Sequence, residues 1–204
     1  MFAVTRYRRE LHAAPAPISA ALRTRRLRDG TEGWIRLLTP GDRDLIAGGV
    51  RRLSARSRYQ RFLSGVPETL PESMLRELVD GVDGVRHIAL VMFVGETPIG
   101  VGRLMRLAGQ SDTADIAITV HDAWQGRGAG AVLAEELLAC AVDVRRLETV
   151  VSADNTASLR LLSRLGTAQV HPSGGTCDVT VDITARPSEQ RRQTGRAPGS
   201  LRRR

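Results

Sequence analysis

Hydrophobic and polar positions alternate with a period of two near the middle of the chain, at residues 113–121. Ile116, Ile118 and Val120 form the apolar side of this segment, whereas Asp115 belongs to the other side. A period of two is that of a β-strand with one face buried. The segment is therefore predicted to be a strand that presents a carboxylate on its more polar side.

Other segments of the chain show the patterns of strands and helices. The turn sequence Asp29-Gly30 predicts a hairpin over residues 24–38. Further strands are expected at residues 87–94, 99–107, 148–152 and 177–184. Helices are expected at residues 42–53, 55–63, 71–79, 128–144 and 155–165, with Gly166 as the residue that ends the last helix in a left-handed conformation. This order predicts an α/β fold, a mixed sheet with helices on both faces.

The ends of the chain differ from its middle in composition. Residues 186–204 are rich in Arg, Pro and Gly, which predicts a disordered tail, and residues 1–22 are expected to be disordered or loosely ordered. One folded domain is then expected at residues 23–185. The net charge of +8 belongs to the tails, because residues 23–184 carry twenty Arg and twenty acidic residues. A neutral body offers no basic face to nucleic acid, so we expect no nucleic-acid partner for it, and such a role would fall to the arginine tails.

Composition also limits the compartment and the cofactors. The chain has no apolar segment long enough for a membrane span, so a soluble, cytoplasmic protein is expected. Cys140 and Cys177 lack the spacing of a metal site, and we expect two free thiols and no metal. All thirty basic residues are Arg, so the chain has no lysine side chain of its own.

The most informative motif is the sequence Gln-Gly-Arg-Gly-Ala-Gly at residues 125–130, between an expected strand and an expected helix. Free N–H groups and the positive end of the helix dipole converge at such a junction, and glycines let a phosphate approach them. The motif lacks the Gly-Lys-Ser/Thr of a Walker A loop. It also lacks the acidic ribose partner of a dinucleotide site. It therefore predicts a pyrophosphate site of another class.

This motif resembles the Q/R-x-x-G-x-G/A sequence of GNAT acetyltransferases, with Gln125, Gly128 and Gly130 at its defining positions. Residues 153–166 resemble the second GNAT pattern, N-x-x-A/S…L-G, and Asn155 is the only asparagine of the chain. The resemblance implies a GNAT fold with a mixed, mostly antiparallel central sheet flanked by helices. It also implies that acetyl-CoA is the co-substrate. The residues implied to bind it are Ile118, Thr119, Val120, Gln125, Gly126, Arg127, Gly128, Ala129, Gly130, Ala131, Asn155 and Ser158.

Over residues 24–184 the chain looks similar to the GNAT domain of bacterial Pat-type protein lysine acetyltransferases. This likeness is carried by residues 27–30, 35–36, 53–54, 57–62 and 87–91. It implies an N-acetyltransferase whose acceptor is a protein lysine, attacked directly by the amine. Two alternatives stay open: a small-molecule amine as the acceptor, or a catalytically weak protein that binds acetyl-CoA as a sensor.

The resemblance implies a catalytic base at Asp115, where Pat-type enzymes have Glu. An amine with a pKa near 10.4 is protonated at neutral pH, so the reaction needs a base. His87 and His121 are rival bases by residue type. Leu162 occupies the position of the tyrosine that protonates the leaving thiolate in many GNAT enzymes, so no general acid is assigned.

The segment at residues 58–62 is implied to flank the acceptor site. Arg58, Tyr59, Arg61 and Phe62 are its candidate substrate contacts. The alternative is that both aromatic rings pack into the core and both arginines are solvated. The sequence leaves the two interpretations equally open.

Overall fold

A computed structural model describes residues 23–65 and 67–183, so both expected tails lie outside the described residues. Its strands form one eight-stranded sheet in the order β1-β2-β3-β4-β5-β6-β8-β7. The strands are β1 (Arg23–Arg26), β2 (Glu32–Leu37), β3 (His87–Val94), β4 (Thr97–Arg106), β5 (Thr113–Val120), β6 (Arg146–Ser152), β7 (Gly166–Ser173) and β8 (Thr176–Ile183). Every neighbouring pair is antiparallel except β5 and β6, which are parallel. The predicted mixed, mostly antiparallel sheet is confirmed.

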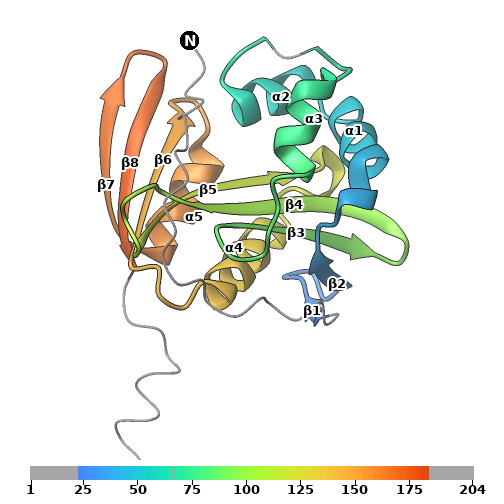
Figure 1. Ribbon diagram of the computed structural model, residues 1–204, viewed down its shortest axis with the longest axis horizontal. Helices are drawn as coiled ribbons and strands as arrows, with labels where there is room; N and C mark the ends of the chain where they lie inside the picture. Colours follow the sequence, from blue (N-terminus) through green and yellow to red (C-terminus); the bar gives the residue numbers. More distant parts are fainter. Residues whose placement is uncertain (1–22, 66, 184–204) are drawn as a thin grey trace, which may run out of the picture.

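Helices cover both faces of this sheet (Figure 1). They are α1 (Arg43–Arg51), α2 (Ala55–Phe62), α3 (Glu72–Val79), α4 (Ala129–Cys140) and α5 (Thr156–Leu165), with short 3-10 turns at Pro40–Asp42 and Asp122–Trp124. The strand β3 is buried on both faces. Its residues Ile88, Leu90 and Met92 belong to the core under α4, and Ala89 and Val91 to the core under α1–α3.

Two glycines of β4 bring α4 close to the sheet. A Cβ added to Gly102 would lie 2.9 Å from Cδ1 of Leu137, and one added to Gly100 would lie 3.2 Å from Cδ1 of Leu133. Both leucines are fully buried. The absence of side chains on this part of β4 therefore lets α4 pack tightly against the sheet, which fixes where its N-terminus lies.

The strand β7 was not predicted, and Gly166 has a different role from the expected one. Gly166 has φ of 170°, which is extended, and it begins β7 instead of ending α5 in a left-handed conformation. Glycine is required there for space, because a Cβ would lie 2.1 Å from the carbonyl oxygen of Asp182 on β8. Most of β7 is exposed at the edge of the sheet, so it lacks the alternation that would indicate a strand.

Candidate functional site

The strands β5 and β6 lie together only at their first residues. Their parallel pairing is limited to Thr113 and Ala114 of β5. Beyond this point β6 pairs with β8, while β5 continues along β4, and the two strands diverge (Figure 1). Where they part, the Thr149 hydroxyl donates a hydrogen bond to the carbonyl of Ile116, at 3.1 Å. The pairing of the sheet is thus interrupted at its centre, and among the described strands none pairs with this edge of β5 there.

This edge of β5 presents backbone groups that no strand of the described part pairs with. The backbone groups of successive residues point alternately to the two sides of a strand. Since the carbonyl of Ile116 faces β6, the N–H and C=O of Ile118 also face the opening. The carbonyl of Val120 accepts a hydrogen bond from Nε2 of Gln125, at 3.1 Å. The backbone of Thr119 faces β4 instead, so Ile118 is the best placed of the three predicted backbone contacts.

The loop between β5 and α4 has the geometry of an anion site. Gly126 and Gly128 have φ of +74° and +97°, a region that residues with a Cβ rarely adopt. Gly128 caps α4, which begins at Ala129 and runs for 12 residues. The first N–H groups of α4 have no partner within the helix, and its dipole favours a negative charge beside them. A pyrophosphate fits this position.

The third glycine of the motif differs from the first two. A Cβ added to Gly130 would make ordinary contacts, 3.7 Å from Cδ2 of Leu161 and 3.8 Å from Cγ2 of Ile118. Gly130 therefore has room for alanine, in agreement with a motif that has either residue at this position. Ala129 is buried beside it in the first turn of α4.

The turn between β1 and β2 contacts this loop, which the sequence did not predict. The backbone N–H of Arg28 donates to the carbonyl of Arg127, at 2.9 Å. The Arg127 guanidinium lies over the ring of Trp124, 4.8 Å from its centroid, and 3.4 Å from a carboxylate oxygen of Asp29. The N-terminal hairpin thereby fixes the backbone that carries Gly128. No sequence motif marks Arg28, because the contact joins residues about a hundred positions apart.

The other side of the opening is formed by the start of α5. The side chain of Asn155 accepts a hydrogen bond from the N–H of Ser158, at 3.1 Å, and so caps this helix. The cap uses the amide oxygen of Asn155, and its amide nitrogen remains available to a ligand. Leu162 is buried in the core, which agrees with its apolar character and supplies no acid.

Asp115 lies on β5 next to the point where β5 and β6 part. It is opposite Met105 of β4 and faces the side of the sheet that α1–α3 cover. Burial raises the pKa of Asp115 above its ordinary value, and this effect outweighs the opposing influence of the nearby Thr149 hydroxyl and the positive charge of Arg61. A carboxylate with a raised pKa is a stronger base. The arrangement differs from a freely solvated aspartate at a strand end.

The two histidines are less suitably placed as bases. His87 lies on the same face as Asp115, but it is buried on β3, two strands away. Burial and the charge of Arg103 lower the pKa of His87 to about 4, which makes it a weak base. His121 follows the far end of β5, six residues from Asp115 and thus about 20 Å along the strand. Only Asp115 adjoins the parting of the strands.

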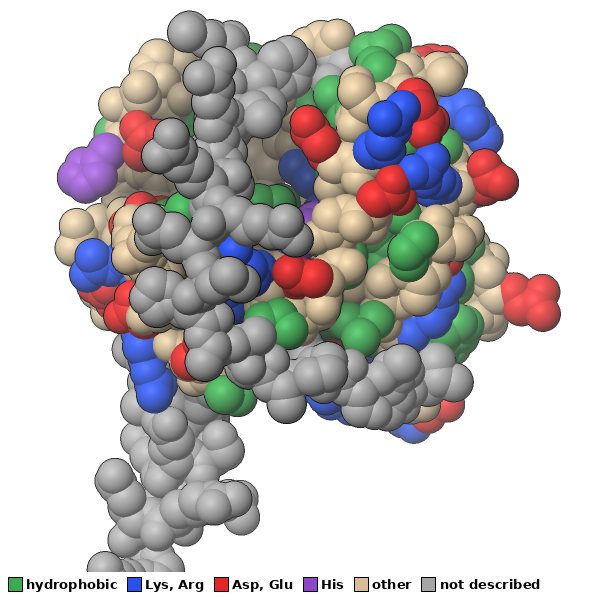
Figure 2. All heavy atoms as spheres, in the orientation of Figure 1, with side chains coloured by type: hydrophobic (Ala, Val, Ile, Leu, Met, Phe, Trp, Pro, Cys, Tyr) green, Lys and Arg blue, Asp and Glu red, His purple; other side chains and the backbone are tan. Residues whose placement is uncertain are grey.

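Helix α2 bridges the two sides of the opening. The Asp122 carboxylate, before the glycine loop, accepts hydrogen bonds from the hydroxyls of Ser54 and Ser57, at 2.9 and 2.6 Å. The Asp154 carboxylate, before α5, lies 3.2 Å from the Arg56 guanidinium. In the view of Figure 2 the surface is hollowed between α2 and the part of the sheet that contains β6. The helix thus lies beside both predicted cofactor elements.

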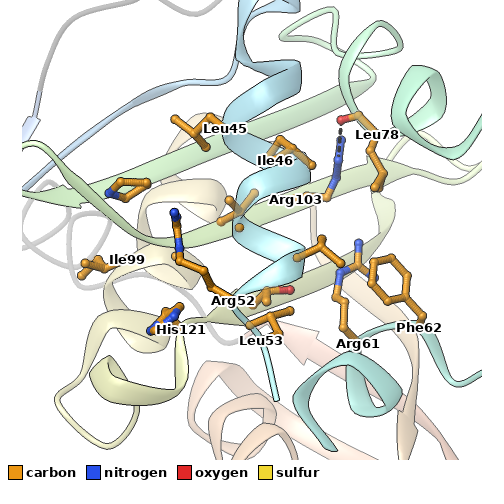
Figure 3. Close-up of a pocket in the computed structure, with 16 residues that line it drawn as sticks. Leu45, Ile46, Arg52, Leu53, Arg61, Phe62, Leu78, Ile99, Arg103 and His121 are labelled. Carbon is orange, nitrogen blue, oxygen red and sulfur yellow. Dashed lines mark hydrogen bonds between the residues drawn. The ribbon is translucent and has the colours of Figure 1, made fainter. Parts of the chain in front are cut away.

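A cavity of about 70 Å³ lies between α1, α2 and the sheet face that carries Asp115. Its walls are mostly apolar, and Arg52, Arg61, Arg103 and His121 also line it (Figure 3). Tyr59 is 48% exposed, so it does not pack into the core. Phe62 does pack there. The Arg58 side chain is bonded to the Leu53 carbonyl and to Glu68, so the alternative of two packed rings and two solvated arginines does not hold for this segment.

Comparisons with known proteins agree with this geometry. Residues 34–168 match the family model described as an acetyltransferase (GNAT) domain. The chain belongs to the GNAT acetyltransferase family. It is 32% identical over 180 residues to the acetyltransferase Pat of Mycolicibacterium smegmatis, an alignment that covers 86% of this chain and 52% of Pat. The predicted resemblance to GNAT and Pat-type domains is confirmed, and this chain spans about half the length of that relative.

Solved structures support the same fold. The GNAT domain of S. lividans PAT matches with a TM-score of 0.72 at 23% identity, over 79% of this chain and 97% of that one. The PaiA N-acetyltransferase of Thermoplasma acidophilum, solved in complex with coenzyme A, matches with a TM-score of 0.57 at 17% identity, over 74% of this chain and 99% of that one. GNAT acetyltransferases use acetyl-CoA, and the open backbone edge and the glycine loop described above fit that molecule.

The structure bears on membrane spans, metal sites and thiols only within residues 23–65 and 67–183. In that part no helix is long and apolar enough to cross a membrane. No group of three or more His, Cys, Asp or Glu side chains there is suited to hold a metal ion. Cys140 and Cys177 are free thiols. Acidic and basic side chains are interspersed over α1–α3 (Figure 2).

Proposed function

We propose that this chain transfers the acetyl group of acetyl-CoA to an amine, with a protein lysine as the acceptor and Asp115 as the base. The observation that carries the proposal is the position of Asp115 at the parting of β5 and β6. The same strand leads from this carboxylate to the glycine loop at the start of α4. One strand thereby links a base to a phosphate site.

Different residues of the opening bind different parts of acetyl-CoA. The backbone of Ile118 offers an N–H and a C=O to the amides of the pantetheine arm, as an added strand would. The N–H groups of residues 126–131 bind the pyrophosphate. Asn155 contacts the arm from the side of α5 with its amide nitrogen. When bound, acetyl-CoA supplies an activated acyl group on a good leaving group.

The chemical task of the protein is to neutralise the attacking amine. The Asp115 carboxylate accepts a proton from the ammonium, directly or through one water molecule, because its side chain is one methylene shorter than the family's glutamate. The amine then attacks the thioester carbonyl. Burial has already raised the pKa of Asp115, so the proton transfer is less unfavourable than to a solvated carboxylate. Water protonates the leaving thiolate, since Leu162 is apolar.

A lysine acceptor is supported by the similarity to Pat, which spans residues outside the cofactor motifs. The cofactor site alone is equally compatible with a small amine. A further alternative, an acetyl-CoA sensor with little activity, would keep the binding site and lose turnover. The requirement for the Asp115 carboxylate distinguishes an enzyme from a sensor, because a sensor does not need a base.

The decisive experiment is incubation with labelled acetyl-CoA and a panel of lysine-rich proteins beside small amines. The chain contains no lysine, so labelling of its own side-chain amines cannot produce background. Transfer to protein lysines that disappears in Asp115→Asn supports the proposal. Transfer only to small amines would show that the acceptor is a small amine and not a protein lysine. Binding of acetyl-CoA without any transfer would favour the sensor.

A further inference from the structure

Arg103 is a buried arginine of β4 with an unsatisfied hydrogen-bond donor. It is 7% exposed. Its Nη1 donates to the carbonyl of Leu78, at 2.6 Å, whereas Nη2 has no hydrogen-bond partner among the described residues. A buried guanidinium without a counter-ion costs free energy that an anion would recover.

Arg61 of α2 lines the same cavity and is partly buried there. Among the described residues, no carboxylate lies within ion-pair distance of its guanidinium, and its nearest acidic influence is Asp115. Burial lowers the pKa of Arg103 to about 9, and the positive charge of Arg61 contributes to this decrease. Arg61 and Arg103 lie at one end of the cavity beside Phe62 and Leu78 (Figure 3). None of the described residues that line the cavity is Asp or Glu.

This end of the cavity adjoins the proposed catalytic base. Asp115 is opposite Met105, and Arg103 is opposite Ala117, so Arg103 is a diagonal neighbour of Asp115 on the same face. Diagonal neighbours across two antiparallel strands are about 7–8 Å apart. A molecule whose amine contacts Asp115 therefore has its adjacent groups within reach of Arg103.

We propose that Arg61 and Arg103 bind a carboxylate that the acceptor carries close to its reactive amine. The inference rests on the proposed acetyl transfer at Asp115 and specifies its substrate class. A carboxylate accepts hydrogen bonds from two guanidinium groups at once. The apolar walls accommodate a short aliphatic stem, and 70 Å³ holds a group of that size. The carboxylate belongs either to an acidic residue beside an acceptor lysine or to a free amino acid.

Binding can be tested without turnover. Propionate has the required carboxylate and stem, and propionamide has the same shape without the charge. At constant ionic strength and pH 7, propionate should raise the melting temperature of the enzyme with increasing concentration, and propionamide should not. Arg103→Met should abolish the response, and so should Arg61→Met, which serves if the first variant fails to fold. Arg51→Met is the matched control, since Arg51 is exposed on α1 outside the cavity lining.

Turnover then distinguishes the two sources of the carboxylate. One arm compares peptides with Glu or Gln beside the acceptor lysine, and the other compares free amino acids with their amides. In the arm that contains the true source, the acceptor with the carboxylate should be preferred to its neutral counterpart by about 10- to 100-fold in kcat/KM. This is the ratio expected for hydrogen bonds to a charged group. The ratio should approach one in Arg103→Met and stay unchanged in Arg51→Met.

Two results would overturn the inference. One is an equal response of the wild-type enzyme to propionate and propionamide, and the other is equal use of charged and neutral acceptors in both arms. Failure of the proposed function has a different appearance: no acceptor is acetylated in either arm, while propionate still stabilises the wild-type enzyme and not Arg103→Met.

Discussion

Ser57 donates its hydroxyl to the Asp122 carboxylate at 2.6 Å and thereby joins α2 to the loop that precedes α4. Asp122 also accepts hydrogen bonds from the backbone and hydroxyl of Ser54. Burial tends to raise the pKa of Asp122, but these hydrogen bonds outweigh it and hold the pKa below its ordinary value. Gln125 donates to the Ser57 hydroxyl as well, at 3.2 Å. The helix that carries Arg61 is therefore connected to the predicted phosphate loop.

We predict that Asp122→Ala weakens acetyl-CoA binding although Asp122 itself contacts no phosphate. Loss of the acceptor leaves Ser54 and Ser57 without their partner and frees the start of α2 and the loop before Gln125. The KM for acetyl-CoA should rise about tenfold, which corresponds to a loss of about 1.4 kcal/mol of binding free energy. Steady-state kinetics measure this. Asp154→Ala, at the other attachment of α2, is the control for general loosening of the helix and should leave the glycine loop intact.

Most of the site was predictable because its parts are local in sequence. The strand β5, the glycine loop and the cap at Asn155 follow one another within about fifty residues, and each has a short pattern with a physical cause. Contacts between distant segments were not predictable. Arg28 contacts Arg127, and the buried Glu136 of α4 pairs with Arg23 and Arg25 of β1. Nothing in the spacing of these residues indicates such pairs.

Element ends were predicted less well than element types. The helix expected to reach residue 144 ends at Cys140, because the apolar residues after it continue the core without continuing the helix: Ala141 and Val144 are buried. A periodic apolar pattern indicates which residues are buried, and Ala141 and Val144 stay buried although the helix has ended. The nearness of Arg61 to Asp115 also depends on how α2 packs on β5, which the sequence does not specify.

We predict that two glycines of the loop differ in their tolerance of side chains. Gly128→Val should abolish acetyl-CoA binding, because Gly128 has a φ of +97° and an added Cβ would lie 3.4 Å from the backbone of Arg28. Gly130→Ala should bind normally, since its Cβ meets only ordinary contacts. Calorimetric titration measures both, with far-UV circular dichroism to show that the fold is retained. Wild-type affinity in Gly128→Val would remove the basis for locating the pyrophosphate here.

We predict that His87 makes the protein acid-sensitive. Its pKa is lowered from 6.5 to about 4 in the fold, so below pH 6.5 the unfolded chain binds a proton that the folded protein does not. The free energy of unfolding should therefore fall by about 3 kcal/mol as the pH decreases from about 6.5 to about 4. His87→Gln, which is neutral throughout, should lack this decrease. Urea unfolding at several pH values measures the slope, and equal slopes in both proteins would contradict the prediction.

The last prediction concerns Asp115 and combines activity with stability. Asp115→Asn keeps the size of the side chain and removes the base, so turnover should fall about 10²- to 10⁴-fold while the affinity for acetyl-CoA persists. Raising the pH should partly restore the variant, because more of the acceptor amine is then neutral. Asp115→Glu should stay active if the site accepts the longer carboxylate. Wild-type turnover in Asp115→Asn, with an unchanged pH profile, would exclude the base.

The pKa of Asp115 fixes the sign of two further effects of this substitution. Because the folded pKa is raised, the wild-type kcat/KM should fall on the acid side as the pH drops through a value above that of an ordinary aspartate. The same shift means that the protonated carboxyl is favoured in the folded protein, so the stability that depends on this proton is lost as the pH rises through that pKa. At neutral pH, Asp115→Asn should therefore melt at a higher temperature than the wild type. A variant that loses turnover through misfolding would melt lower, so calorimetric melting curves separate a lost base from a damaged fold.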